Sequence, residues 1–338
     1  MVTTTFNLLG VKGKGSELRV VFDAARRQGG YPSLNDCLLK GPDNFMNNGV
    51  LPVLLGFRNG RVAAVADLRK FHNQVYLVQE DVHMQRFYWR DLKTDEPPKT
   101  YAMVANNFGV KPANCIATSA LHKSADLFAD KYPLESEEIK QQTYVDDELV
   151  AAPGMEELRT KTHRMDEICE HANMPNKGWL YSGDVTAPDI SIGNGVSGVE
   201  QVSEKVLGAL WNPGSDNFYF VTTLKLKTVD GEMHEISTLE EFQIIKESLL
   251  ITRKVGLSNI ARIFDPVGFL VSILLELKLL IRESWCGEQL GWDDPLPPDQ
   301  QKRWITFLSS LLSIGEVLFE RSLWAEGRVV GLPTLMIF

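Results

Sequence analysis

Two acidic positions embedded in apolar runs constrain the fold of this chain more than any other feature. Residues 61–68 (RVAAVADL) predict a buried strand that ends near Asp67. Residues 143–152 (TYVDDELVAA) predict a β-hairpin that carries Asp146 and Asp147 at its turn. A buried carboxylate without a partner is very costly, and a divalent cation is one partner that would satisfy it. The sequence therefore predicts a sheet edge at which carboxylates from two adjacent strands meet.

Carboxylates in this arrangement suit phosphoryl chemistry that depends on two metal ions. Mg²⁺ prefers oxygen ligands at about 2.0–2.1 Å and keeps waters and substrate phosphates in its coordination shell. Two such ions roughly 3.5–4 Å apart can activate a 3′-hydroxyl and stabilise a leaving pyrophosphate. The acid pair alone is weakly specific, because a solvated turn explains an isolated pair such as Asp293 and Asp294.

The rest of the pattern is mixed at first and mainly helical past about residue 240. Apolar and β-prone residues predict strands at 19–24 and 82–91, and 206–211 is a further short apolar stretch. Helical spacing predicts helices at 112–130, 155–172, 270–281 and 304–312. The turn residues Asn106, Asn107 and Gly109 precede the first of these helices. The fold class predicted from this order is α+β.

Charge, the longest apolar run and the cysteine spacing argue against a membrane-spanning, zinc-binding or secreted protein. The 338-residue chain has a formal net charge of −9, which is unusual for a nucleic-acid-binding protein. The first 130 residues nevertheless carry 16 Lys and Arg against 12 Asp and Glu, so phosphate contacts would come mainly from there. The apolar run at 266–275 is too short to span a membrane. The four cysteines match no zinc or disulfide spacing, so we expect a reduced intracellular protein, cytoplasmic or nuclear and not secreted.

Several sequence blocks surround the adjacent aspartates in a fixed order. They are LRVVFDA (18–24), SLNDCLLKGPD (33–43), VADLRKFHNQV (65–75), QRFYWRD (85–91), NFGVKPANCIATSALHKSA (107–125), YVDD (144–147), NKGWLYSGD (176–184), VLGALWNP (206–213) and a segment at 252–285 that begins TRKVGLSNIARIFDPVG. YVDD resembles the catalytic hairpin of reverse transcriptases. The whole set is similar to the reverse transcriptase of BEL/Pao-type long-terminal-repeat retrotransposons, and SLNDCLLKGPD and FDPVG point to that type.

The resemblance implies a right-hand polymerase that makes DNA on an RNA template. The expected parts are partial fingers at 1–60, a palm at 61–225 with a fingers insertion around 76–106, and a helical, truncated thumb or connection-like segment at 226–338. The implied cofactors are two Mg²⁺ ions, for which Mn²⁺ can substitute. The implied partners are an RNA or DNA template with its primer and deoxynucleoside triphosphates, with no membrane.

The resemblance also implies roles for individual residues. Asp67, Asp146 and Asp147 would be the catalytic residues and the metal ligands. The expected nucleotide-binding residues are Lys12, Arg19, Leu68 through its backbone carbonyl, His72, Gly109 and Lys177. A positive charge from Lys12 and Arg19 suits the phosphates, and Gly109 lets the backbone come close to the templating pair. The expected primer-binding residues are Leu207, Gly208 and Trp211.

Several of these residues also have a plain structural explanation. Arg19 could pair with a surface carboxylate, and Lys12 lies in a glycine-rich loop tip that needs no functional lysine. Lys177 is open to the same explanation. Trp211 is a common type of core residue, and Cys115 is expected to be a small buried helix residue.

The chain departs from the family at the position five residues after Asp67. The family usually has Phe or Tyr there to exclude the sugar 2′-hydroxyl, whereas this chain has His72, and Phe71 could shift to take the role. We also find no aspartic protease, zinc knuckle, ribonuclease H or integrase motif. The alternative function is therefore a catalytically inactive transposon remnant, or a domesticated fragment that binds nucleic acid or protein. Because the chain starts inside the fingers, we expect weak primer–template binding and poor extension without the upstream sequence.

Overall fold

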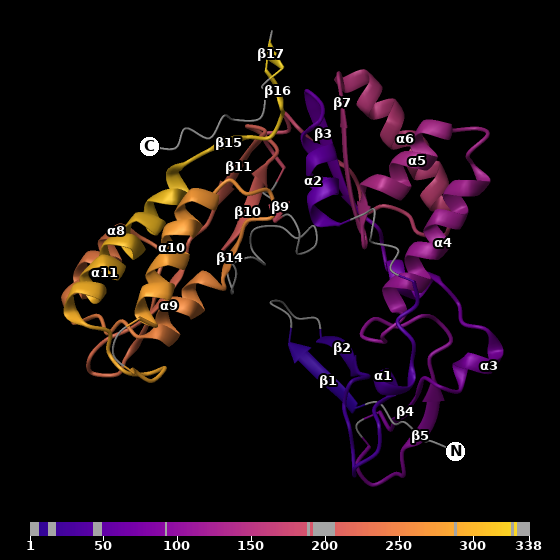
Figure 1. The fold of residues 1–338 in the computed structure, drawn as a ribbon. Helices are drawn as coiled ribbons and strands as arrows, with labels where there is room; N and C mark the ends of the chain where they lie inside the picture. The colour runs from indigo at the N-terminus through magenta and orange to yellow at the C-terminus, as the bar shows by residue number, and fades with distance from the viewer. Residues whose placement is uncertain are drawn as a thin grey trace. The chain divides into compact units, whose positions relative to one another are not determined.

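The computed structural model describes residues 7–12, 18–42, 49–91, 93–187, 190–191, 207–286, 289–325 and 328–329. The chain divides into two compact units (Figure 1). The first contains Met1–Gly56 and Ala64–Trp179, and the second contains Phe57–Ala63 and Leu180–Phe338. The fold is mixed α and β, as the sequence predicts. The boundaries of fingers, palm and thumb remain a prediction, because they rest on function.

A four-stranded sheet carries the two acidic segments. Its strands are β6 (Thr143–Tyr144), β7 (Asp147–Ala152), β3 (Val62–Asp67) and β8 (Leu180–Tyr181), in the order β6-β7-β3-β8. The central positions of β3 and every position of β7 are buried, which explains why both strands are apolar without strict alternation. The predicted strand and hairpin are therefore confirmed.

Three helices pack together beside β7 in the first unit (Figure 1). They are α4 (Ala113–Leu127), α5 (Pro133–Gln142) and α6 (Met155–His171). The buried residues of α6, which include Leu158, Met165 and Ile168, follow one face at helical spacing. The predicted helices at 112–130 and 155–172 are thus confirmed, whereas α5 is an addition that the sequence analysis missed.

The rest of the first unit consists of short elements. The hairpins are β1 (Asn7–Lys12) with β2 (Leu18–Asp23), and β4 (Arg86–Trp89) with β5 (Lys99–Ala102). The helical segments are α1 (Leu34–Cys37), α2 (Val50–Arg58), η1 (Phe71–Gln74) and α3 (Gln79–Val82), of which α2 runs into the second unit. A small core joins β2, β4 and the start of α4, where the rings of Phe22 and Phe87 meet edge to face at 5.2 Å.

The second unit combines a sheet with a helical layer. The sheet has the order β14-β10-β11-β15, with β9 beside β10, and comprises β14 (Ile263–Phe264), β10 (Leu207–Asn212), β11 (Asn217–Phe220), β15 (Phe319–Glu320) and β9 (Ile190–Ser191). Two further hairpins are β12 (Leu224–Lys227) with β13 (Met233–Ile236), and β16 (Trp324–Ala325) with β17 (Arg328–Val329). The helices are α8 (Leu239–Ile245), η2 (Lys246–Ser248), α9 (Arg253–Ile260), α10 (Val271–Ser284), α11 (Pro298–Leu312) and η3 (Ser313–Glu316).

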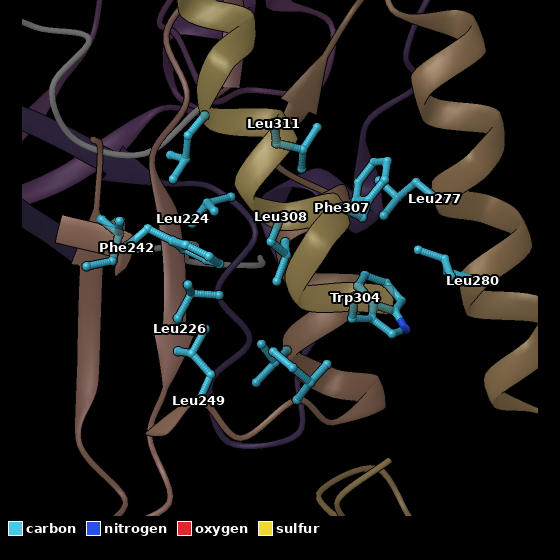
Figure 2. Close-up of a cluster of buried hydrophobic side chains, with 14 of the residues drawn as sticks. Leu224, Leu226, Phe242, Leu249, Leu277, Leu280, Trp304, Phe307, Leu308 and Leu311 are labelled. Carbon is cyan, nitrogen blue, oxygen red and sulfur yellow. The ribbon is translucent and has the colours of Figure 1, made fainter. Parts of the chain in front are cut away.

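The core of the second unit lies between the β12–β13 hairpin and its helices. Figure 2 shows the side chains that fill it, with Trp304, Phe307, Leu308 and Leu311 of α11 at the centre. The predicted leucine-rich and tryptophan-containing stripes are its helical walls. A Cβ added to Gly256 of α9 would lie 2.6 Å from the Trp304 ring, so this glycine allows α9 to approach α11.

Candidate active site at the ends of β3 and β7

The ends of the two acidic segments meet in the first unit. The backbone N–H of Leu68 donates to the carbonyl oxygen of Asp146 at 2.8 Å, immediately after β3 ends at Asp67. Tyr144 pairs with Asp147 across the hairpin, which leaves Val145 and Asp146 as the turn. The structure thus brings Asp67 and Asp146 next to each other, as the sequence predicts.

The turn contains an unusual backbone conformation. Val145 has a φ of +59°, in the left-handed region that β-branched residues rarely adopt. Such a conformation costs on the order of 1–3 kcal/mol and concentrates at functional sites. Glycine at this position of a two-residue turn would adopt the same φ without strain. Because the chain has valine instead, the surrounding sheet has to hold Val145 in this conformation.

The electrostatics of Asp67 follow from its position. Its side chain is 13% exposed. Burial raises the pKa of the Asp67 carboxyl above its ordinary value, and the nearby charge of Asp146 raises it further. The ammonium of Lys177 acts in the opposite direction. The pKa of Asp67 is therefore raised mainly by burial, and the Asp146 charge contributes less.

Lys177 is the cation that pairs with Asp67. Its Nζ lies 2.5 Å from Asp67 Oδ1, and its backbone N–H donates to the carbonyl oxygen of Asp67 at 2.9 Å. The Lys177 side chain is 54% exposed. The structure therefore places this sequence-predicted residue directly on the carboxylate at the end of β3.

A second acid lies buried behind the turn. Glu148 follows Asp147 on β7 and is fully buried, and burial raises the pKa of its carboxyl to about 7. The thiol of Cys169 donates to Glu148 Oε1 at 3.4 Å, and the Asn176 side chain also hydrogen-bonds to this carboxyl. Glu148 was not among the predicted site residues, although the acid inside the apolar run DELVAA is a sequence signal for it.

The start of α4 lies beside the hairpin turn. A cavity of about 380 Å³ is lined by Lys40, Lys111, Asn114 and Cys115 together with Tyr144 and Val145, among others. Gly109 has a φ of +87°, and a Cβ there would lie 3.1 Å from the carbonyl oxygen of Phe22. The start of α4 thus lies close to the acidic hairpin, whereas Gly109 packs against the backbone of Phe22 on β2. Cys115 is half-buried on α4 rather than fully buried.

His72 lies on η1 and is held from α4. Its Nε2 is 2.6 Å from Oδ1 of Asn114. Phe71 is only 2% exposed, and its ring meets the His72 ring edge to face at 5.2 Å. The expectation that Phe71 could replace the missing aromatic is therefore wrong in this conformation, because Phe71 belongs to the core.

The other predicted site residues are only partly described. Lys12 and Arg19 lie at the paired ends of β1 and β2, and their side chains are outside the described part of the chain. The same holds for the side chain of Leu207 and for the surroundings of Gly208 on β10. Trp211 is fully buried, and its ring meets the Phe57 ring edge to face with the ring centroids 5.2 Å apart. Its Nε1 donates to Asp216 at 2.9 Å. The Trp211 side chain thus belongs to the core, so any contact with a primer would come from its backbone.

The donor set suits a hard divalent cation. The charge of Asp146 lies close enough to the Asp67 carboxyl to raise its pKa, and the Leu68 N–H joins the end of β3 to the Asp146 carbonyl oxygen. In the residues that the structure describes, no three His, Cys, Asp or Glu side chains are gathered closely enough to form a complete ligand cluster. Within those same residues, no helix has both the length and the apolar character needed to cross a membrane.

The comparisons with known proteins find a family model that matches part of the chain and a solved structure with a similar fold. Residues 252–338 match the family model described as Pao retrotransposon-like RNaseH-like domain. No curated protein matches the sequence. Among solved structures, the chain is similar to the foamy viral protease-reverse transcriptase dRH in complex with double-stranded DNA, with a TM-score of 0.51 and 13% sequence identity. The similarity covers 91% of this chain and 43% of that one, so our chain spans less than half of its length.

Residues 252–338 are therefore similar to a retrotransposon domain, and the fold of the chain is similar to part of a protease-reverse transcriptase chain. The family model describes residues 252–338 as RNaseH-like, whereas no ribonuclease H motif was found in the sequence. The thumb or connection-like segment expected at 226–338 remains a prediction. This stretch shows mainly apolar helical stripes and offers no acidic motif, which is why motif reasoning could not recognise it.

Proposed function

We propose that this chain is the polymerase part of a BEL/Pao-type retrotransposon pol protein and catalyses RNA-directed DNA synthesis. The observation that carries the proposal is the hydrogen bond between Leu68 and Asp146, which joins the carboxyl end of β3 to the acidic turn. The raised pKa of Asp67 and the strained Val145 support it, because perturbed acids and backbone strain concentrate at functional sites.

In this proposal the acids hold the catalytic cations. Asp67, Asp146 and Asp147 would bind two Mg²⁺ or Mn²⁺ ions, with the backbone carbonyl of Leu68 beside them. When bound, such ions activate the primer 3′-hydroxyl and neutralise charge on the leaving pyrophosphate. The chain's own contribution is to fix the carboxylates at one sheet edge, where the β3–β7 pairing limits their movement.

The remaining residues would bind the nucleotide and the primer. Lys12 and Arg19 would contact the triphosphate, and Lys177 would supply a proton or a positive charge to the pyrophosphate. His72, held by Asn114, would face the sugar, and Gly109 would let the backbone approach the templating pair. Leu207, Gly208 and the backbone of Trp211 on β10 would support the primer strand.

A second candidate function is nucleolytic, because the matching family is described as RNaseH-like. In the described part of residues 252–338, the carboxylates of Asp265 and Glu283 both have partners within the protein. Asp265 accepts backbone N–H groups from Gly268 and Leu270, and Glu283 pairs with Arg303. Cleavage of an RNA–DNA hybrid should therefore be measured beside polymerisation. An inactive remnant that only binds nucleic acid or protein would show neither activity.

The proposal is tested by single-nucleotide addition to a DNA primer annealed to an RNA template. The enzyme should be in excess over primer, so that a slow reaction is still counted. We expect addition by the wild-type chain and its loss in Asp146→Asn. The matched control is Asp293→Asn, which alters the other adjacent aspartate pair at an exposed position and should leave the rate unchanged. Equal rates in Asp146→Asn and wild type, or no addition by either, would contradict the proposal.

A further inference from the structure

The segment that carries Lys177 is attached to α6 through a single carboxylate oxygen. Asn176 Nδ2 donates to Asp166 Oδ1 at 2.7 Å, and Trp179 Nε1 donates to the same oxygen at 2.9 Å. These two donors flank Lys177 in the sequence. Asp166 lies on α6 and is half-buried, and none of the functional roles discussed above includes it.

The same segment is attached on its other side to the end of β3. Leu68 and Asn176 form an isolated β-bridge, and Arg69 N donates to the carbonyl oxygen of Pro175 at 2.9 Å. Lys177 N donates to the carbonyl oxygen of Asp67 at the same distance. Gly178 follows with a φ of +122°, a turn conformation that side chains rarely adopt. Backbone bonds thus set the path of the segment, and Asp166 fixes its side chains.

We propose that Asp166 is a positioning residue that holds Lys177 on Asp67 and thereby sets how readily Asp67 accepts a divalent cation. A flexible, half-exposed lysine gains little from a single ion pair, because ordering its side chain costs entropy. A segment held from both sides removes much of that cost. The Lys177 ammonium and a divalent cation then compete for the same carboxylate. The inference rests on the proposed function only in assigning a cation to Asp67.

The first test measures Lys177 itself in the full, metal-free chain. An amine-acylating reagent is applied briefly, and the extent of modification at Lys177 is measured by mass spectrometry relative to Lys123, an exposed lysine on α4. We expect Asp166→Ala to raise the relative rate at Lys177 by about two- to fivefold, the range that a partly exposed ion pair contributes. Asp166→Asn should stay near wild type, because both hydrogen bonds end on one oxygen that Asn retains.

A difference between these two variants separates positioning from general destabilisation. Equal increases in Asp166→Ala and Asp166→Asn, or no increase in either, would overturn the inference. Asp67→Asn provides the upper limit, because it removes the partner of Lys177 altogether.

The second test measures binding of Mn²⁺ alone by electron paramagnetic resonance, without nucleotide. Asp166→Ala and Lys177→Met should each tighten binding by about two- to fivefold, and the double variant should add nothing further. Additive effects would overturn the inference. If Asp67→Asn binds Mn²⁺ as tightly as wild type, the metal site of the proposed function fails, while the acylation result still decides the role of Asp166.

Discussion

The two units of this protein each contain an ion pair at a strand end, and the two pairs are built differently. Arg321 in the second unit is completely buried and donates from Nε and Nη2 to the two carboxylate oxygens of Asp216. Its guanidinium also donates to the carbonyl oxygens of Phe57 and Gly60. Lys177 in the first unit makes one side-chain contact to Asp67 and remains 54% exposed.

This difference separates an ion pair that supports the fold from one that can be exchanged. Each nitrogen of the Arg321 guanidinium donates to a fixed protein acceptor, so no ligand could replace it without leaving buried groups unpaired. The Lys177 pair is a single contact at a half-exposed site, and another cation can take the place of the ammonium at little cost. The two ion pairs therefore differ in how many fixed protein acceptors the cation has, and not in the presence of opposite charges.

The largest effect is expected from Arg321→Met. Removal of the guanidinium leaves the half-buried Asp216 carboxylate without its cationic partner and several backbone carbonyls without this donor, which should lower the free energy of unfolding by about 3–5 kcal/mol. Urea unfolding measures the change. The matched control is Arg303→Met, which breaks the exposed pair with Glu283 and should cost less than about 1 kcal/mol. Similar losses in both variants would show that the buried pair has no special structural weight.

Glu148 sharpens the comparison because it is a buried acid without a cationic partner among the contacts described. Its folded-state pKa of about 7 lies above the ordinary value of 4.5, so the folded state binds the proton more tightly. Its contribution to stability is present below pH 4.5 and is lost as the pH rises to about 7. That loss is on the order of 3 kcal/mol.

Glu148→Gln should remove this pH dependence. The difference in unfolding free energy between the variant and wild type should grow in favour of the variant from pH 4.5 to pH 7 and then level off. Unfolding in urea at a series of pH values provides the measurement. A constant difference across this range would mean that Glu148 does not titrate there.

Asp67→Asn should separate function from stability. Burial disfavours the charged form of Asp67, so the neutral isostere should be as stable as wild type or more stable, by about 1 kcal/mol at most. Nucleotide addition should nevertheless be lost. Thermal unfolding and the primer assay on the same preparation test this, and a marked fall in stability would make Asp67 a structural residue like Asp216.

The smallest effect on stability is expected from Lys177→Met. A single partly exposed ion pair contributes less than about 1 kcal/mol. Substitution by Met should thus lower the free energy of unfolding several-fold more at position 321 than at position 177. Comparable costs at the two positions, measured by urea unfolding, would remove the distinction drawn above.

Local patterns in the sequence predicted the parts of the fold that depend on neighbouring residues. Apolar runs identified β3 and the β6–β7 hairpin, and helical spacing identified α4 and α6. The helix α5 was missed because its sequence PLESEEIKQQ is mostly polar and buries Glu135 and Ser136 beside Ile139. Tertiary packing against α4, α6 and β7 overrides its weak periodicity.

The sequence predicted those site residues that lie within recognisable motifs. The adjacency of Asp67 and Asp146 was predictable because each residue lies at the end of a predicted strand. The ion pair of Lys177 with Asp67 was not predictable, because it forms only when tertiary folding brings the Lys177 segment back to β3. The partners of Asp166 and Glu148 lie 10 to 28 residues away in the sequence, and those of Arg321 lie at least 105 residues away. No local pattern encodes such pairs, because they depend on how separate elements pack.

The central claim is that the ends of β3 and β7 share a divalent cation, and localised oxidative cleavage tests it directly. Fe²⁺ takes the place of Mg²⁺, and ascorbate with hydrogen peroxide produces radicals that cut the backbone near the bound iron. The account predicts cuts next to both Asp67 and Asp146, suppressed by excess Mg²⁺ and absent in Asp67→Asn. Cuts confined to residues 252–338, or cuts that persist unchanged in Asp67→Asn, would contradict it.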